Sequence, residues 1–448
     1  MITLEDSREI HRISKQYICI SEGYDLHFWG DVSLLVLIKG RFHFRLTKPQ
    51  TDILEKCTGL NTVDDIVNES VKGRNGSEEQ IKIAKINVKN LLYNMVHKGF
   101  LSVSDKPCIL SNKNARFSGE RGKYYPYDIS IELTSRCNFN CAFCYKRSTA
   151  KGNDISFDLL REFKHSVVGK VKEIRLMGGE PTIYPHFQDV VCDLSKDFLL
   201  SIVTNGSVLH KYSLDTIKKI DNIQVSLYGY SPETYKKNTG IAGWHNVQKS
   251  VEKANLACVD TKGCVTLSRD AIDNFEKYII GAINLGLKRL TFGYPSPAGR
   301  AQDSFNSADG CRFTQDDLTY IYKLMREMMF KYESQINLTV WQHGMLKKEK
   351  EKVAFEECSK CLDCGAGWYS LVISEKGRVR PCELLDAKIF DYGDINAISS
   401  IINGYFFEKE LCAAIPKFES YISENGVCLD DICPTLKRYK QNFKLLES

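Results

Sequence analysis

The stretch IELTSRCNFNCAFCYKR, residues 131–147, contains three closely spaced thiols. It continues the alternating apolar segment YDISIEL, which predicts a β-strand. Cys137, Cys141 and Cys144 follow, separated by three and two residues. Three thiolates on one loop can hold three irons of a cubane iron–sulfur cluster and leave the fourth iron open. The spacing favours such a cluster, because structural zinc needs four protein ligands and a disulfide framework would not leave an odd thiol.

Composition sets the class of protein. A chain of 448 residues has room for two or three domains, and 43% hydrophobic with 26% charged residues is typical of a globular protein. The net charge of +5 gives no reason to expect nucleic-acid binding. The charged N-terminus predicts no signal peptide, and the apolar run SLLVLI is too short to cross a membrane. We therefore expect a cytoplasmic protein, in which the 17 cysteines indicate metal or redox chemistry.

The CxxxCxxC spacing, with Phe143 directly before the last cysteine, resembles the radical S-adenosylmethionine (radical SAM) superfamily. The resemblance implies that the open iron binds the amino and carboxylate groups of S-adenosylmethionine. It also implies that an electron, supplied by a donor such as flavodoxin or ferredoxin, cleaves the sulfonium to give a 5′-deoxyadenosyl radical. A zinc knuckle and a plain electron-transfer cluster are the alternatives for the same three cysteines.

Residues 127–345 alternate between strand and helix patterns six times. The predicted strands contain DISIEL, EIRLM, LLSIV, NIQVSLY, CVTLS and RLTFGY. Six such units predict an α/β domain, an open partial (β/α)6 barrel with its helices outside. In this architecture the chemistry gathers at the C-terminal ends of the strands, and the three-cysteine loop lies at such an end.

Further strand ends carry candidate cofactor contacts. GGEPT follows the second strand, TNG the third, and QVSLYG ends the fourth. Glycines let backbone NH and CO groups approach an ammonium or a carboxylate. The family resemblance assigns the amino group of S-adenosylmethionine to the Gly-Gly-Glu segment, and for TNG a turn after a strand is nearly as good an interpretation as a cofactor contact. The predicted cofactor-binding residues are Phe143, Gly178, Gly179, Glu180, Asn205 and Ser226.

The chain departs from the family pattern at two places. Tyr228 stands where the family often has an acidic residue, and Asn238 and Thr239 stand near a frequent arginine. The segment YPSPAGRA, with Gly299 and Arg300, resembles family members of this type. Arg300 is predicted to be a substrate or carboxylate clamp, or else a surface residue.

Residues 1–104 read as a separate module. Four alternating segments predict a small antiparallel sheet, followed by three helices, with Thr62 as the N-cap of the second. The third helix carries an apolar stripe that includes Ile83 and Leu92. This winged-helix-like order resembles the leader-peptide recognition domain of ribosomal-peptide maturases, in which an extended peptide adds to the sheet edge. A DNA-binding winged helix and a structural cap are the alternatives, and residues 105–126 read as a linker.

Residues 346–448 form a second cysteine-rich region. A hairpin is predicted around Gly377, which lies between Cys364 and Cys382 in a pattern that resembles SPASM and twitch extensions. The resemblance implies one auxiliary 4Fe–4S cluster. A second requires an open iron or another ligand, because seven cysteines cannot supply eight thiolates. A zinc ribbon is the alternative. The predicted ligands are Cys358, Cys361, Cys364, Cys382, Cys428 and Cys433.

The order of the three regions resembles the sactipeptide maturases of the subtilosin type. This resemblance implies that the enzyme acts on a precursor peptide with a leader and joins a cysteine sulfur to a carbon atom. The same layout serves carbon–carbon crosslinking, epimerisation and formylglycine formation in sulfatases. A DNA-binding redox sensor is an alternative from another class. The radical step needs no acid–base pair, and we nominate none.

Overall fold

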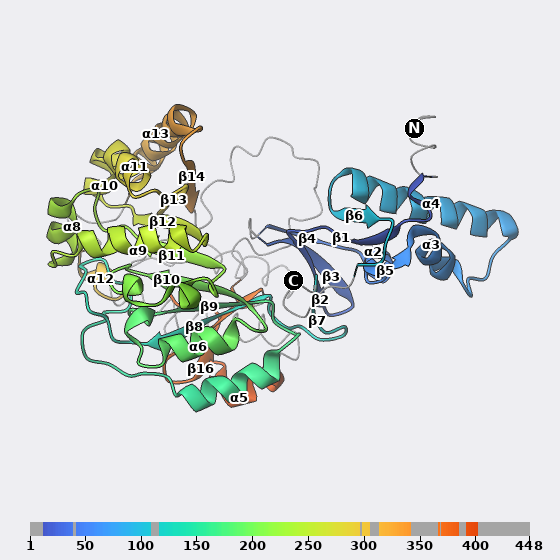
Figure 1. The fold of residues 1–448 in the computed structure, drawn as a ribbon, viewed down its shortest axis with the longest axis horizontal. Coiled ribbons are helices and arrows are strands. Elements are labelled where there is room, and N and C mark those ends of the chain that lie inside the picture. Colours follow the sequence, from blue (N-terminus) through green and yellow to red (C-terminus); the bar gives the residue numbers. More distant parts are fainter. Residues whose placement is uncertain are drawn as a thin grey trace, which may run out of the picture. The chain divides into compact units, whose positions relative to one another are not determined.

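The computed structural model describes residues 12–38, 42–108, 116–295, 298–304, 313–341, 366–367, 369–384 and 391–401. The chain divides into two compact units, residues 1–127 and residues 128–448 (Figure 1). Within the described residues, no helix is both long and apolar enough to span a membrane.

The first unit contains two small sheets. The three-stranded sheet has the order β5-β1-β6 and is antiparallel, and the four-stranded sheet has the order β4-β3-β2-β7. The strands are β1 (Tyr17–Ile20), β2 (Tyr24–Trp29), β3 (Val32–Leu37), β4 (Phe42–Arg45), β5 (Thr58–Thr62), β6 (Leu101–Ser104) and β7 (Phe117–Gly119).

Three helices of this unit have both ends within the described residues, and side-chain caps fix where they begin. They are α2 (Lys48–Leu54), α3 (Val63–Val71) and α4 (Glu78–His97). The predicted N-cap Thr62 is confirmed: its hydroxyl accepts from the Asp65 backbone NH at 3.2 Å, and the Asp65 carboxylate accepts from the Thr62 NH at 2.9 Å. Leu92 of α4 is buried in the core, whereas Ile83 is 52% exposed. The predicted apolar stripe is therefore only partly covered.

Part of the predicted linker is a strand. β7 pairs in parallel with β2, through Leu26 with Phe117 and Phe28 with Gly119. Three residues are too few to show a periodicity, which is why the sequence pattern gave no sign of this strand.

The second unit is built on a ten-stranded sheet with the order β14-β13-β12-β11-β10-β9-β8-β15-β16-β17. Its first eight strands in this order are parallel. The six predicted strands are confirmed as β8 to β13, and β14 adds a seventh next to β13. They are β8 (Asp128–Thr134), β9 (Glu173–Gly178), β10 (Leu199–Thr204), β11 (Asn222–Ser226), β12 (Asp260–Thr266), β13 (Arg289–Gly293) and β14 (Asn337–Trp341).

Helices connect these strands, and the buried strand β8 lies inside the sheet (Figure 1). All seven residues of β8 are buried, as expected for a parallel strand covered on both faces. The connecting helices are α5 (Phe157–Val167), α6 (Phe187–Leu194), α7 (Leu214–Ile217), α8 (Pro232–Thr239), α9 (Trp244–Leu256), α10 (Arg269–Asp273), α11 (Phe275–Asn284), α12 (Ala301–Ser304) and α13 (Gln315–Tyr332).

The predicted hairpin around Gly377 is confirmed, and it belongs to the main sheet. β15 (Ser370–Ile373) and β16 (Arg378–Arg380) pair antiparallel, with Gly377 at φ +73° in the turn. β15 also pairs in parallel with β8. β17 (Gly393–Asp394) follows β16, and α14 (Ile398–Ile401) comes last among the described elements. The hairpin therefore extends the sheet that carries the three-cysteine loop.

Candidate functional site

The three-cysteine loop begins where β8 ends. The Cys137 NH donates to the Thr149 carbonyl at 2.7 Å, and the Cys144 NH donates to the Cys141 carbonyl at 3.2 Å. Cys141 is buried, and Cys137 and Cys144 are half-buried. The structure therefore brings the three predicted ligands together on one folded loop.

Burial sets the acidity of these thiols. Burial raises the pKa of Cys137 to about 11 and that of Cys141 to about 12, and neighbouring thiols of the loop add to both shifts. Thiols this close act on one another's charge, and positive iron would favour their deprotonation. Among the described residues, no three His, Cys, Asp or Glu side chains are placed to enclose a single metal ion. Thiolates of a cubane bind different irons, so they need not converge on one point.

Arg300 donates three hydrogen bonds to backbone carbonyls in and next to the three-cysteine loop. Its backbone NH donates to the Cys144 carbonyl at 2.8 Å. Its side-chain Nε donates to the Cys141 carbonyl at 2.9 Å, and Nη2 donates to the Ser148 carbonyl at 2.9 Å. These contacts occupy the guanidinium with the protein's own backbone. Of the two predictions for Arg300, a substrate clamp or a surface residue, neither describes these contacts.

The Gly-Gly-Glu segment packs against the same loop. The Gly179 NH donates to the Thr134 carbonyl at 2.7 Å, and the Glu180 NH donates to the Arg136 carbonyl at 2.9 Å. A Cβ on Gly179 would lie 2.0 Å from the Arg136 carbonyl oxygen, so only glycine fits there. These two NH donors are used within the protein, and a ligand ammonium, which only donates hydrogen bonds, would need backbone carbonyls as its acceptors.

The Glu180 carboxylate points into the protein. It is 1% exposed and accepts hydrogen bonds from the Thr182 NH at 3.1 Å, the Thr204 hydroxyl at 2.6 Å and the Asn205 NH at 2.7 Å. The Thr182 hydroxyl also donates to it. Burial raises the pKa of Glu180, and these hydrogen bonds oppose the rise. Glu180 thereby ties the end of β9 to the end of β10.

Asn205 connects the TNG segment with the three-cysteine loop. Its side-chain NH2 donates to the Asn138 side-chain oxygen at 2.9 Å, and Asn138 in turn donates to Ser207 at 2.8 Å. A hydrogen bond from Asn205 also lowers the pKa of Cys137, although burial dominates that pKa. The turn prediction for TNG is confirmed by Gly206, whose φ is +74°.

Two aromatic rings of the three-cysteine loop lie close to the Tyr228 ring. The Phe143 ring lies 5.4 Å from the Tyr228 ring, and Phe139 lies 6.0 Å from Tyr228. Ser226 hydrogen-bonds with Tyr228, whose pKa is raised well above its usual value, first by burial and then by Cys141. Asn238 donates to the Tyr228 carbonyl at 2.7 Å. Tyr228 therefore adjoins two of the predicted cofactor contacts, Phe143 and Ser226.

One predicted auxiliary ligand is described. Cys382 follows β16, is half-buried, and accepts a hydrogen bond from the Leu384 NH at 3.4 Å. Amide donors of this kind are typical around cluster thiolates. The other predicted ligands lie outside the described residues: Cys358, Cys361, Cys364, Cys428 and Cys433.

The residues of the three-cysteine loop fit an iron–sulfur cluster with one open iron. Cys137, Cys141 and Cys144 provide thiol donors on a loop fixed by β8, Gly179 and Arg300, and amide groups approach the sulfurs. The Phe139 NH, for example, donates to Cys137 Sγ at 3.4 Å. The site lies at the C-terminal edge of a parallel sheet, where α/β proteins bind their ligands.

Sequence reasoning missed several residues of this site. The motif spacing does not single out Asn138, which lies between two of the cysteines. The strand pattern does not single out Glu132, which is fully buried beside the loop. Glu132 shares one face of β8 with Asp128, and carboxylates in a strand predicted to lie inside a parallel sheet are the sign that could find it.

The family model for the radical SAM superfamily matches residues 131–279. This range starts at the strand that leads into the three-cysteine loop and includes the Gly-Gly-Glu segment and Ser226. Residues 131–279 are therefore a radical SAM domain, the domain of radical SAM enzymes. That family implies a 4Fe–4S cluster and S-adenosylmethionine.

Curated relatives include two proteins of Bacillus subtilis (strain 168). The antilisterial bacteriocin subtilosin biosynthesis protein AlbA is 22% identical over 398 residues, which cover 87% of this chain and 82% of that protein. The sporulation killing factor maturation protein SkfB is 24% identical over 278 residues, which cover 60% of this chain and 63% of that protein. Among solved structures, Streptococcus suis SuiB bound to S-adenosylmethionine has a TM-score of 0.58 at 13% identity, covering 87% of this chain and 89% of SuiB. That likeness concerns the fold.

Proposed function

We propose that this chain is a maturase of a ribosomally synthesised peptide, which forms thioether bonds between a cysteine sulfur and a carbon atom of its substrate. The observation that carries the proposal is the similarity to the subtilosin biosynthesis protein over 87% of the chain, which takes in both units. A probable GTP 3′,8-cyclase matches only 60% of this chain, so that similarity accounts for less of it.

The chemistry divides between cofactor and protein. When bound, the cluster and S-adenosylmethionine supply a 5′-deoxyadenosyl radical that takes one hydrogen atom from the peptide carbon. The sulfur–carbon bond forms as the thiol proton and one electron leave the peptide. The protein's part is to hold the three-cysteine loop through Arg300 and to present the carbonyls of Gly178 and Gly179 to the cofactor ammonium. Phe143, Asn205 and Ser226 complete the proposed cofactor contacts.

The leaving electron needs an acceptor. We propose an auxiliary 4Fe–4S cluster in residues 346–448 for this role, with Cys382 among its ligands. Support comes from the spacing of Cys364, Gly377 and Cys382 and from the amide donor at Cys382 Sγ. The electron that starts the reaction is proposed to come from flavodoxin or ferredoxin.

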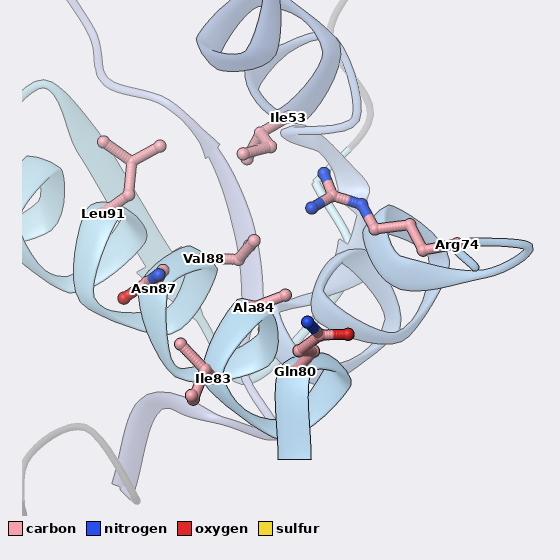
Figure 2. A pocket seen from close by; sticks show the side chains of 8 residues that line it. All are labelled: Ile53, Arg74, Gln80, Ile83, Ala84, Asn87, Val88 and Leu91. Carbon is pink, nitrogen blue, oxygen red and sulfur yellow. The ribbon is translucent and has the colours of Figure 1, made fainter. Parts of the chain in front are cut away.

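We propose further that the first unit binds the leader of the precursor. A groove of about 390 Å³ lies between α2, the α3–α4 connection and residues 80–91 of α4 (Figure 2). Ile83, Val88 and Leu91 of α4 and Ile53 of α2 give it apolar walls, and Arg74 extends over it. No acidic side chain of the described residues pairs with Arg74. This combination suits an apolar peptide segment that carries an acidic residue.

The product tests the main proposal. Anaerobically reconstituted full-length protein is incubated with S-adenosylmethionine, dithionite and each cysteine-containing peptide that a short open reading frame beside its gene is found to encode. We expect 5′-deoxyadenosine and a peptide that has lost two hydrogens per crosslink, with fragmentation placing the bond at sulfur. The variant lacking Cys137, Cys141 and Cys144 should give neither. 5′-Deoxyadenosine with a peptide modified at carbon only would replace thioether formation by crosslinking or epimerisation. Absence of 5′-deoxyadenosine from iron-loaded wild type would overturn the proposal.

Peptide affinity tests the leader groove. Binding of the fluorescently labelled precursor is measured by anisotropy for Ile83→Asp and Arg74→Glu. We expect each change to weaken binding at least about tenfold, which corresponds to roughly 1.4 kcal/mol. The matched control is Ile86→Asp, since Ile86 lies on the same helix, is similarly exposed at 49% and does not line the groove. Equal effects of Ile83→Asp and Ile86→Asp would assign leader binding to another surface.

A further inference from the structure

Glu132 is a fully buried carboxylate on β8, five residues before Cys137. Each of its oxygens faces a cation from a different segment. Oε2 lies 2.5 Å from the Lys146 ammonium, and Oε1 accepts a hydrogen bond of 2.5 Å from Arg380 Nη2. Lys146 is two residues beyond Cys144, and Arg380 is two residues before Cys382. One carboxylate therefore joins the three-cysteine loop to the C-terminal hairpin.

The side chains of Glu132, Lys146 and Arg380 are all buried or nearly so. The side chains of Lys146 and Arg380 are 12% and 10% exposed, and that of Glu132 is not exposed at all. Removing one partner of such a buried set leaves an uncompensated charge and is costly. The parallel pairing of β15 with β8 carries the hairpin to this place. Sheet register and ion pairing therefore fix the hairpin and the loop with respect to each other.

Tyr145 lies in the chain between Cys144 and Lys146 and is buried. Its pKa is raised well above its usual value, first by burial and then by the negative charges of Glu132 and Glu383. Arg380 acts on it in the opposite direction, and the Cys144 thiol acts on it as well. The Tyr145 side chain, directly next to Cys144 in the sequence, therefore interacts electrostatically with both Glu132 and Arg380. Lys146 follows Cys144 by two residues and contacts Glu132, which contacts Arg380, so these charges adjoin the loop that would hold the cluster.

We propose that Glu132, Lys146 and Arg380 form a network of positioning residues through which the C-terminal hairpin sets the reduction potential of the cluster at the three-cysteine loop. The inference depends on the radical SAM assignment and is independent of the peptide product. A cluster becomes more negative on reduction, so a nearby buried cation stabilises its reduced form and a nearby buried anion destabilises it. The two cations and the carboxylate therefore act on the potential with opposite signs.

The opposite effects of the carboxylate and the cations on the reduction potential allow a direct test. Glu132→Gln removes an anion and should raise the potential, whereas Arg380→Gln removes a cation and should lower it. The double variant should return close to wild type. The full-length protein is reconstituted with iron, and the potential is read from a redox titration followed by electron paramagnetic resonance. The signal that changes when S-adenosylmethionine is added identifies the cluster at the loop.

Asp128→Asn is the matched control. Asp128 is a buried carboxylate at the other end of β8, where it lies 3.6 Å from Arg175 Nη2 and accepts a hydrogen bond from Ser370 at 2.7 Å. Its neutralisation should leave the potential unchanged. Iron content per chain, measured for every variant, reports any general loss of structure.

Shifts of Glu132→Gln and Arg380→Gln in the same direction, or no shift in either, would overturn the proposal. If Glu132→Gln does not fold, Lys146→Met replaces it and should lower the potential as Arg380→Gln does, whereas Arg380→Lys keeps the charge and should stay near wild type. A wild-type enzyme that cleaves S-adenosylmethionine but forms no thioether would end the proposed function and leave this test intact.

Discussion

Replacing Arg300 by alanine removes two side-chain hydrogen bonds that hold the three-cysteine loop, one to the Cys141 carbonyl and one to the Ser148 carbonyl, each 2.9 Å long. Hydrogen bonds to charged groups contribute about 1.5–3 kcal/mol each. Because Arg300 is only partly buried, the lower end applies, which gives about 3 kcal/mol for the pair. That free energy corresponds to roughly a 100-fold loss in the population of the ordered loop.

Iron retention measures this loss. Reconstituted proteins are challenged with an iron chelator under anaerobic conditions, and the release of iron is followed by absorbance. We expect Arg300→Ala to lose its iron up to about 100-fold more readily than wild type. Arg300→Lys should fall between them, because an ammonium keeps the charge but not the planar fork of donors.

Arg147→Ala is the matched control for the same loop. Arg147 follows the last cysteine by three residues and pairs with Asp303 at the surface, and exposed ion pairs contribute little. Its removal should leave iron retention near that of wild type. If Arg300→Ala and Arg147→Ala behave alike, the reasoning that Arg300 fixes the loop is refuted.

Three further predictions concern the same unit. Gly299→Ala should lower iron content, because its Cβ would lie 2.2 Å from the Tyr145 carbonyl oxygen at φ +61°; iron analysis equal to wild type would contradict this. Glu180→Ala should cost about 3 kcal/mol or more in urea unfolding, since buried donors lose their acceptor; a change below about 1 kcal/mol would be inconsistent with that role. Hydrogen bonds from Arg269 lower the pKa of Asp317, so its stabilising effect is present above its unfolded pKa of 3.8 and is lost as pH falls. The difference in urea midpoint between cluster-free wild type and Asp317→Asn should therefore shrink from pH 7 to pH 3, and a constant difference would disprove the assignment.

The sequence alone was sufficient for features that depend on neighbouring residues. The spacing of Cys137, Cys141 and Cys144 identified the radical SAM superfamily, because one loop supplies all three ligands. Alternation of strand and helix patterns predicted β8 to β13, since each pattern reports which face of its own segment is buried. The N-cap Thr62 and the turn at Gly377 were equally local, because a cap or a turn is formed within a few residues.

Only the tertiary structure decided how distant segments meet. The parallel pairing of β15 with β8 joins strands more than two hundred residues apart, and no periodicity within either strand selects its partner. The same applies to Arg300, whose side chain could face solvent or backbone until the fold placed it against the three-cysteine loop. Glu180 was identified by its motif, but its direction, into the protein, follows from four donors, two on Thr182 of its own segment and two on Thr204 and Asn205 at the end of β10. Burial of Glu132 between Lys146 and Arg380 depends likewise on long-range packing, because a carboxylate in a covered strand is stable only where the fold delivers its cations.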